Sequence, residues 1–169
     1  MIRRIVVCSM LLFIAVLPFA SCDEGTPQKK VGTPAEALGM APGFSLQDLS
    51  GRTFNLEGYR GKVVLVYFTT TWCPYCKRDI PNLKKMYDRY RDRDFEILSI
   101  FIQESRQKVS SFAERYELPY PVLLDPDGAV AARYGVRGVP TKIVVSPDGT
   151  MVCWMCGDLE GSLEKLLGK

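Results

Sequence analysis

The feature that most constrains the fold is an apolar run, Val63 to Phe68, that is soon followed by a C-x-x-C motif at Cys73 and Cys76. An unbroken apolar run of this length is typical of a strand that is buried on both faces of a sheet. After the motif, apolar residues recur with helical spacing from Pro74 to Tyr90. The sequence therefore predicts a buried strand, a cysteine pair where the strand gives way to a helix, and a long helix.

The remainder of the chain alternates between strand and helix patterns. We expect further strands at residues 44–46, 53–56, 95–102, 122–124, 142–145 and 150–154, and helices at residues 105–116, 129–134 and 159–167. The first two strands flank Ser50-Gly51 and should form an N-terminal β-hairpin, and the last two flank the turn signal Pro147-Asp148-Gly149. This order predicts an α/β fold, in which a central mixed sheet is flanked by helices.

Residues 1–21 have the layout of a secretory signal peptide. Arg3 and Arg4 precede an apolar run from Ile5 to Val16, which is shorter than the ~20 apolar residues of a membrane-spanning helix. The small residues at 20 and 21 are followed by Cys22, and this segment resembles the signal of a bacterial lipoprotein, in which that cysteine is acylated. The alternative is an ordinary signal peptide with an incidental cysteine near its end.

Residues 22–40 are rich in Pro, Gly, Thr and Lys and contain few large apolar residues, so we expect a flexible tether. Residues 41–169 are enough for one domain with its own core. Without the signal, the chain has twenty basic residues against nineteen acidic ones, and no basic patch suggests a nucleic-acid partner. The sequence contains no histidine, which excludes Ser-His-Asp and Cys-His catalysis and every histidine-ligated metal site.

Cys73 is the candidate nucleophile. It precedes Pro74, which suits the first position of a helix because the amide at that position needs no partner. A cysteine at a helix N-terminus has its thiolate stabilised, which typically lowers the pKa to ~3.5–7.5 from ~8.5. Cys76 lies one helical turn further on, and this spacing brings two Cα atoms to roughly 5 Å, within the range of a disulfide.

Around this motif, Trp72, Pro81 and Gly138-Val139-Pro140-Thr141 complete a pattern that resembles the active site of the thioredoxin superfamily, in particular its TlpA/ResA-like membrane-tethered branch. The resemblance implies a thioredoxin-like fold, a cis peptide before Pro140, and no bound cofactor or metal. It also implies that the loop at Pro140 packs against the disulfide and binds the substrate chain. The residues expected to contact substrate are Trp72, Pro74, Tyr75, Val139, Pro140 and Thr141.

Asp79 lies one turn beyond Cys76, where its position resembles that of an acidic residue that tunes the cysteines in the TlpA-like branch. Thioredoxins proper instead carry a buried acid on the preceding strand, where this chain has Tyr67. Our hypothesis is that Asp79 accepts the proton of Cys76 as it attacks the mixed disulfide. The alternative is a helix acid that simply faces solvent.

A second C-x-x-C motif, at Cys153 and Cys156, departs from the family pattern. We place it in a strand, where three residues span ~10 Å and the two ends face opposite sides, so an internal disulfide requires the strand to break or turn. The strand should end near the active-site face, which makes these cysteines candidate auxiliary thiols. The alternative that we prefer is two buried cysteines that act as small apolar residues.

These features predict thiol–disulfide exchange with protein substrates, in which Cys73 reacts and Cys76 resolves the mixed disulfide. We expect an exported, membrane-anchored lipoprotein that faces the periplasm and acts as a monomeric reductase, for example in cytochrome c maturation, with a membrane thiol reductase as electron donor. The alternatives are a peroxiredoxin-type thiol peroxidase, whose motif would need a proline where Val66 stands, and a non-catalytic metal-binding protein with thiolate ligands.

Overall fold

The computed structural model describes residues 39–168. The predicted signal peptide, the acylation site at Cys22 and most of the predicted tether lie outside these residues. Gly39 and Met40 belong to the predicted tether, but they already pair with the sheet. Met40 forms a β-bridge with Thr150, and the backbone amide of Met151 donates to the carbonyl of Gly39. The ordered contacts of the domain therefore begin before residue 41, where we had placed its start.

A seven-stranded mixed sheet forms the centre of the domain, with the strand order β2-β1-β5-β4-β3-β6-β7. The strands are β1 (Ser45–Asp48), β2 (Thr53–Asn55), β3 (Val63–Thr69), β4 (Phe95–Ile102), β5 (Val122–Asp125), β6 (Thr141–Val145) and β7 (Met151–Trp154). Strands β3, β4 and β5 run parallel, while β6 and β7 and the β1–β2 hairpin are antiparallel to their neighbours. The predicted fold class and the N-terminal hairpin are confirmed.

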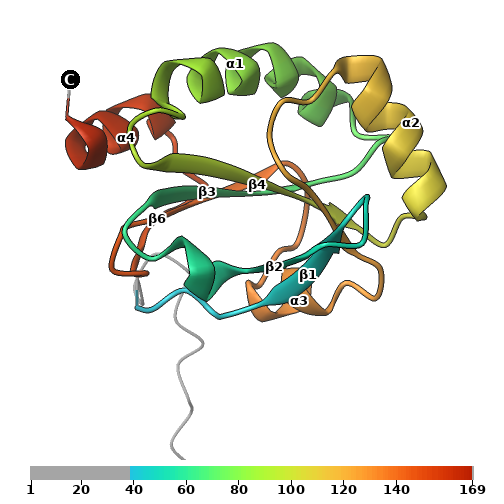
Figure 1. Ribbon diagram of the computed structural model, residues 1–169, viewed down its shortest axis with the longest axis horizontal. Coiled ribbons are helices and arrows are strands. Elements are labelled where there is room, and N and C mark those ends of the chain that lie inside the picture. Colours follow the sequence, from blue (N-terminus) through green and yellow to red (C-terminus); the bar gives the residue numbers. More distant parts are fainter. Residues whose placement is uncertain (1–38, 169) are drawn as a thin grey trace, which may run out of the picture. The chain divides into compact units, whose positions relative to one another are not determined.

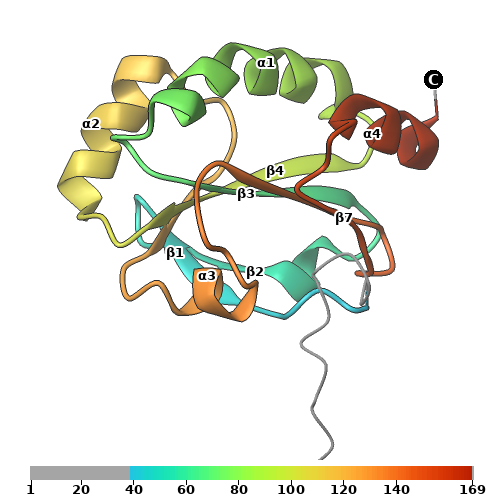
Figure 2. The same ribbon diagram turned by 180° about the vertical axis from the view of Figure 1, so that it is seen from behind.

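Helices cover both faces of this sheet. They are α1 (Pro74–Tyr90), α2 (Arg106–Tyr116), α3 (Ala129–Arg133) and α4 (Leu159–Leu167), with a short 3-10 helix at Leu56–Tyr59. Figures 1 and 2 show α1, α2 and α4 on one face and α3 on the other. No helix within residues 39–168 has both the length and the apolar character that crossing a membrane requires.

The central strand β3 is buried along its whole length, because side chains that alternate along it enter cores on opposite faces. Val64, Val66 and Phe68 pack on the face that α3 covers, and Leu65 and Tyr67 pack on the face that α1 and α4 cover. The run Val63 to Phe68 is therefore apolar throughout. Since β3 is fixed by packing on both faces, its carboxyl end provides a rigid support for the segment that carries the cysteines.

Candidate active site

Cys73 occupies the N-cap of α1, directly after the turn that follows β3. Its Sγ accepts a hydrogen bond from the backbone amide of Cys76 at 3.1 Å, which is the position where a helix N-terminus stabilises negative charge. The two cysteines form a disulfide with their Cα atoms 5.3 Å apart. They are only 2% and 1% exposed, so a partner reaches the sulfur atoms at one edge of the domain.

The loop before β6 contacts the cysteine pair from the other side. The Val139–Pro140 peptide is cis, as the resemblance implied, and the carbonyl oxygen of Val139 lies 3.6 Å from Sγ of Cys73. Thr141 fixes this loop, because its hydroxyl donates to the carbonyl of Gly138 at 2.7 Å while its backbone pairs with β3 opposite Phe68. The fold thus brings together two segments that are more than sixty residues apart in the sequence.

A groove of about 300 Å³ adjoins this loop, and Trp72, Val136, Arg137 and Val139 are among the residues that line it. Trp72 is 64% exposed and Tyr75 is 63% exposed, although both are large and apolar in character. The guanidinium of Arg78 lies over the ring of Tyr75, 4.4 Å from its centroid. Exposed aromatic rings beside a buried sulfur pair form a surface suited to bind a polypeptide.

The carboxylate of Asp79 is partly buried and has two side-chain partners, Lys142 and Tyr67. Its carboxylate pairs with Nζ of Lys142 at 2.8 Å and accepts a hydrogen bond from the hydroxyl of Tyr67 at 3.5 Å. Both side chains of the ion pair are about one quarter exposed, at 24% and 25%. Burial raises the pKa of Tyr67, and the negative charge of Asp79 raises it further, so this phenol stays protonated and donates. Asp79 is therefore a partly buried, paired acid, and its role toward Cys76 stays a prediction.

Glu104 is a residue of the site that we did not anticipate from the sequence. It follows the end of β4, and its buried carboxylate accepts from the backbone amide and from the hydroxyl of Thr71, each at 2.6 Å. Nζ of Lys108 pairs at 2.7 Å with Oε1 of Glu104, the oxygen that also accepts from the hydroxyl of Thr71. A polar residue just after an apolar strand was the available signal, because parallel strands β3 and β4 end at the same edge of the sheet.

Our preferred interpretation of Cys153 and Cys156, as unpaired strand cysteines, is wrong. Strand β7 ends at Trp154, Met155 adopts a left-handed backbone conformation with φ of 50°, and the chain turns. The turn brings the Cα atoms to 5.5 Å and the two cysteines form a disulfide. Both are partly exposed, and they adjoin the core cluster beneath α1 and α4.

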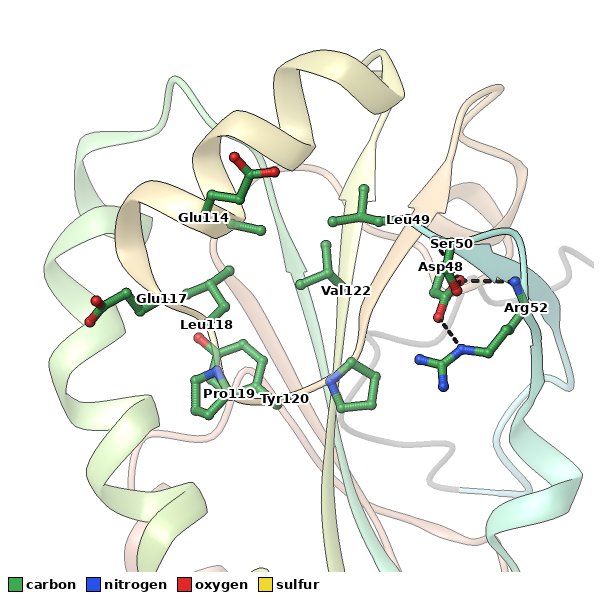
Figure 3. Close-up of a pocket in the computed structure, with 12 residues that line it drawn as sticks. Asp48, Leu49, Ser50, Arg52, Glu114, Glu117, Leu118, Pro119, Tyr120 and Val122 are labelled. Carbon is green, nitrogen blue, oxygen red and sulfur yellow. Dashed lines mark hydrogen bonds and ion pairs between the residues drawn. The ribbon is translucent and has the colours of Figure 1, made fainter.

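A more voluminous hollow, of about 580 Å³, lies elsewhere. Figure 3 shows it between the β1–β2 turn and the end of α2, lined by residues that include Asp48, Leu118 and Tyr120. Unlike the smaller groove, which Trp72 and Val139 line, this hollow includes no residue of the segment around Cys73 or of the cis-proline loop, and its charged side chains Asp48 and Arg52 bind each other. Its size therefore does not make it the centre of the chemistry, and the smaller groove beside Cys73 is the better candidate.

A disulfide at the N-terminus of a helix, facing a cis-proline loop at the edge of a mixed sheet, defines the class of thioredoxin-like proteins. Residues 38–153 match the model of the AhpC/TSA family. The thiol–disulfide oxidoreductase ResA of Geobacillus thermodenitrificans is 36% identical over 141 residues, which cover 83% of this chain and 79% of the relative. The chain belongs to the AhpC/TSA family, and within the thioredoxin superfamily it is a thiol–disulfide oxidoreductase of the TlpA/ResA-like branch.

Solved structures agree with this assignment. The thioredoxin domain of a thiol–disulfide oxidoreductase from Bacteroides vulgatus matches with a TM-score of 0.72 and 28% identity, covering 78% of this chain and 98% of that one. A secreted disulfide oxidoreductase of Mycobacterium tuberculosis matches with a TM-score of 0.59 and 30% identity, covering 64% of this chain and 79% of that one.

Proposed function

We propose that this oxidoreductase works as a reductase of protein disulfides, with Cys73 as the nucleophile and Cys76 as the resolving thiol. The observation that carries the proposal is the position of the Cys73 sulfur, which lies between the amide of Cys76 and the carbonyl of Val139 beside the exposed groove. The amide and the helix N-terminus stabilise a thiolate, while the groove supplies room for the substrate chain.

The reaction proceeds from the dithiol form. The thiolate of Cys73 attacks one sulfur of the substrate disulfide; that S–S bond breaks, the leaving substrate thiolate takes up a proton, and a mixed disulfide forms. Cys76 then loses its proton and attacks the sulfur of Cys73, which releases the second substrate thiol. Two electrons have passed to the substrate, and the Cys73–Cys76 disulfide that the structure contains remains.

We assign the proton of Cys76 to Asp79 in this second step. Asp79 lies one turn after Cys76 on α1, and its contact with Lys142 keeps a positive charge beside the carboxylate. Tyr67 donates to the same carboxylate, so the three side chains form a half-buried polar group along the inner side of α1. A carboxylate in such a group can take up a proton as the thiol is consumed.

We further propose that the protein acts outside the cytoplasm, held to a membrane through acylated Cys22. The layout of residues 1–21 supports export, and the Mycobacterium tuberculosis relative is a secreted protein. More than one acyl chain on Cys22 would anchor the domain firmly, since a single chain binds only marginally. A membrane thiol reductase would regenerate the dithiol, and a disulfide of apocytochrome c, reduced to its two thiols, is the substrate that we propose, with the protein acting as a monomer.

The decisive experiment measures the reduction potential of the Cys73–Cys76 pair and traps its substrate. A potential near that of thioredoxin, about −270 mV, supports a reductase, whereas one near −120 mV would make the protein an oxidant. Reduced Cys76→Ser protein should accumulate a mixed disulfide with disulfide-bonded apocytochrome c or model disulfide peptides, and Cys73→Ser should not. Consumption of hydroperoxide at a rate above that of disulfide reduction would favour the peroxidase alternative instead.

The anchor is tested separately with Cys22→Ala. Fatty-acid labelling should be lost, and the protein should move from the membrane fraction to the extracytoplasmic soluble fraction. Retention of the label on the variant would show that Cys22 is not the acylated residue, without affecting the assignment of the active site.

A further inference from the structure

The second disulfide lies at a strand end that is already held by other contacts. The backbone amide of Met155 donates to the carbonyl of Lys142 at 2.8 Å, and the indole of Trp154 donates to the carbonyl of Tyr134 at 3.3 Å. These bonds fix both sides of the turn independently of the sulfur atoms. The Cys153–Cys156 bond also closes a very short loop, and such loops remove little entropy from the unfolded chain. The Cys153–Cys156 disulfide is therefore expected to add little to the stability of the fold.

The surface around the second disulfide resembles the surface around the first in one respect. Five large apolar residues are strongly exposed in the described part of the chain: Met40, Trp72, Tyr75, Val152 and Met155. Four of the five are neighbours of a C-x-x-C cysteine, two at each motif. Exposed apolar side chains that gather beside a disulfide mark a surface on which another protein can bind.

The second cysteine pair and Asp79 of α1 contact Lys142 from two sides. The carbonyl of Lys142 contacts Sγ of Cys156 at 4.0 Å and binds the amide of Met155, while Nζ of Lys142 pairs with Asp79. A hollow of about 490 Å³ opens beside Lys142 between α1 and α4, with Met86 and Leu159 among its lining residues. The second pair therefore lies next to an accessible recess on the same face of the sheet as α1.

We propose that Cys153–Cys156 is a second thiol–disulfide exchange site, which a protein dithiol reduces whether or not Cys73–Cys76 is present. The thiolate of the dithiol attacks one sulfur of the pair; the Cys153–Cys156 bond breaks and a mixed disulfide forms. The second thiol of the partner then attacks the partner's sulfur in the mixed disulfide, and the cysteine that was bound to it leaves as a thiol. The partner leaves as a disulfide, and two electrons and two protons remain on Cys153 and Cys156.

The test uses the full chain with Cys73→Ser and Cys76→Ser, so that only the second pair can react. Native protein is incubated with reduced thioredoxin as the dithiol probe, and free thiols are alkylated and counted by mass spectrometry, with folding followed by circular dichroism. We expect two alkylated cysteines at 153 and 156 while the protein remains folded, and full reoxidation by glutathione disulfide. Alkylation that appears only after denaturant is added would overturn the proposal.

The exposed residue beside the pair supplies a second, independent measurement. Met155→Ser should slow reduction by thioredoxin several-fold and leave reduction by dithiothreitol unchanged, because only the protein partner needs the apolar contact. Met40→Ser is the matched control, since Met40 has a similar exposure of 58% against 57% for Met155. Equal effects of the two replacements would contradict a docking surface at Met155. Because neither measurement uses Cys73, failure here leaves the proposed reductase function untouched.

Discussion

At the scale of single residues, the site depends on two carboxylates that support the cysteines from different elements. Glu104 holds the segment before Cys73 through two short bonds to Thr71, and Asp79 joins Lys142 on the inner side of α1. Neither carboxylate contacts a sulfur atom, and we expect Glu104 to act on the position of the cysteine segment and Asp79 on its proton exchange. Their roles can be separated, because one is expected to act on position and the other on protonation.

Replacement of Glu104 should affect both stability and the active site. Glu104→Ala leaves the buried amide and hydroxyl of Thr71 without a partner, and an unsatisfied buried polar group costs about 1–3 kcal/mol. Chemical denaturation of the disulfide form measures this loss, and the reduction potential should shift with it. Glu104→Gln keeps an acceptor oxygen and should recover part of both properties.

Lys108→Ala is the matched control for Glu104. Lys108 is about half exposed, and without it both oxygens of Glu104 keep their bonds to Thr71, so its loss should cost less than ~1 kcal/mol. A loss as large as that of Glu104→Ala would mean that the ion pair, and not the contact with Thr71, supports this segment.

Replacement of Asp79 should change the kinetics of resolution. Asp79→Asn removes the proton acceptor, and loss of a general base typically slows a step by roughly 10²-fold or more. Single-turnover release of a reduced substrate peptide, followed as a rate profile from pH 5 to 9, should show this slowing. Asp88→Asn, an exposed acid on the same helix, should leave the profile unchanged. An unaltered profile for Asp79→Asn would remove the proposed role.

At the scale of elements, the β1–β2 hairpin depends on its turn. The carboxylate of Asp48 accepts from the amides of Ser50 and Arg52, from the hydroxyl of Ser50, and from the guanidinium of Arg52, as Figure 3 shows for Arg52. Burial alone would raise the pKa of Asp48, but these hydrogen bonds outweigh it and lower the pKa to about 2. The turn is therefore stabilised by an ionised side chain that has lost most of its solvent.

This arrangement makes the hairpin sensitive to acid. Because the pKa of Asp48 is lower in the folded state than its ordinary value of 3.8, the carboxylate stabilises the fold above pH 4 and loses this effect as the pH falls toward 2. Asp48→Asn should lower the free energy of unfolding by about 1–3 kcal/mol at pH 6. Urea denaturation should show that the difference in the free energy of unfolding between variant and wild type shrinks as the pH falls from 4 to 2. A difference that stays constant with pH, or an equal difference for Asp92→Asn at an exposed position, would contradict the stabilising role of ionised Asp48.

At the scale of the whole molecule, the sheet collects distant segments at one edge. The carboxyl ends of β3 and β4, the start of β6 and the N-terminus of α1 meet there, since β3 pairs with β4 in parallel and with β6 antiparallel. The buried sulfur pair is thereby surrounded by exposed aromatic side chains and a groove. Recognition of a polypeptide and reaction at sulfur are expected to depend on different residues of this edge.

A comparison of protein and small-molecule substrates should separate recognition of the polypeptide from reaction at sulfur. Trp72→Ala should reduce kcat/KM for a protein disulfide about tenfold, as expected for an aromatic contact worth more than 1 kcal/mol. The rate with a small aromatic-free disulfide such as glutathione disulfide should be nearly unchanged, because Cys73 and its helix N-terminus are intact. Equal losses with both substrates would show that Trp72 supports the cysteines and not the bound chain.

The sequence by itself determined the features that arise within one short segment. The buried strand, the cysteine pair and α1 follow from apolar spacing and from the helix N-terminus at Cys73, and α1 has the predicted bounds Pro74–Tyr90. The cis peptide at Pro140 followed from the resemblance of its motif. Local spacing accounts for the strand, the cysteine pair and α1, whereas the cis peptide was implied by the resemblance alone, and neither required the distant parts of the chain to be known.

Only the tertiary structure decided the partners of the carboxylates and the pairing of the second cysteines. Thr71 and Glu104 are 33 residues apart, and they meet because β3 and β4 run parallel and end together. Asp79 reaches Lys142 because α1 packs over β6, and Cys153 reaches Cys156 because the chain turns at Met155. Spacing in the sequence predicts contacts along one element, but contacts between elements depend on register, strand ends and packing, which the whole fold sets.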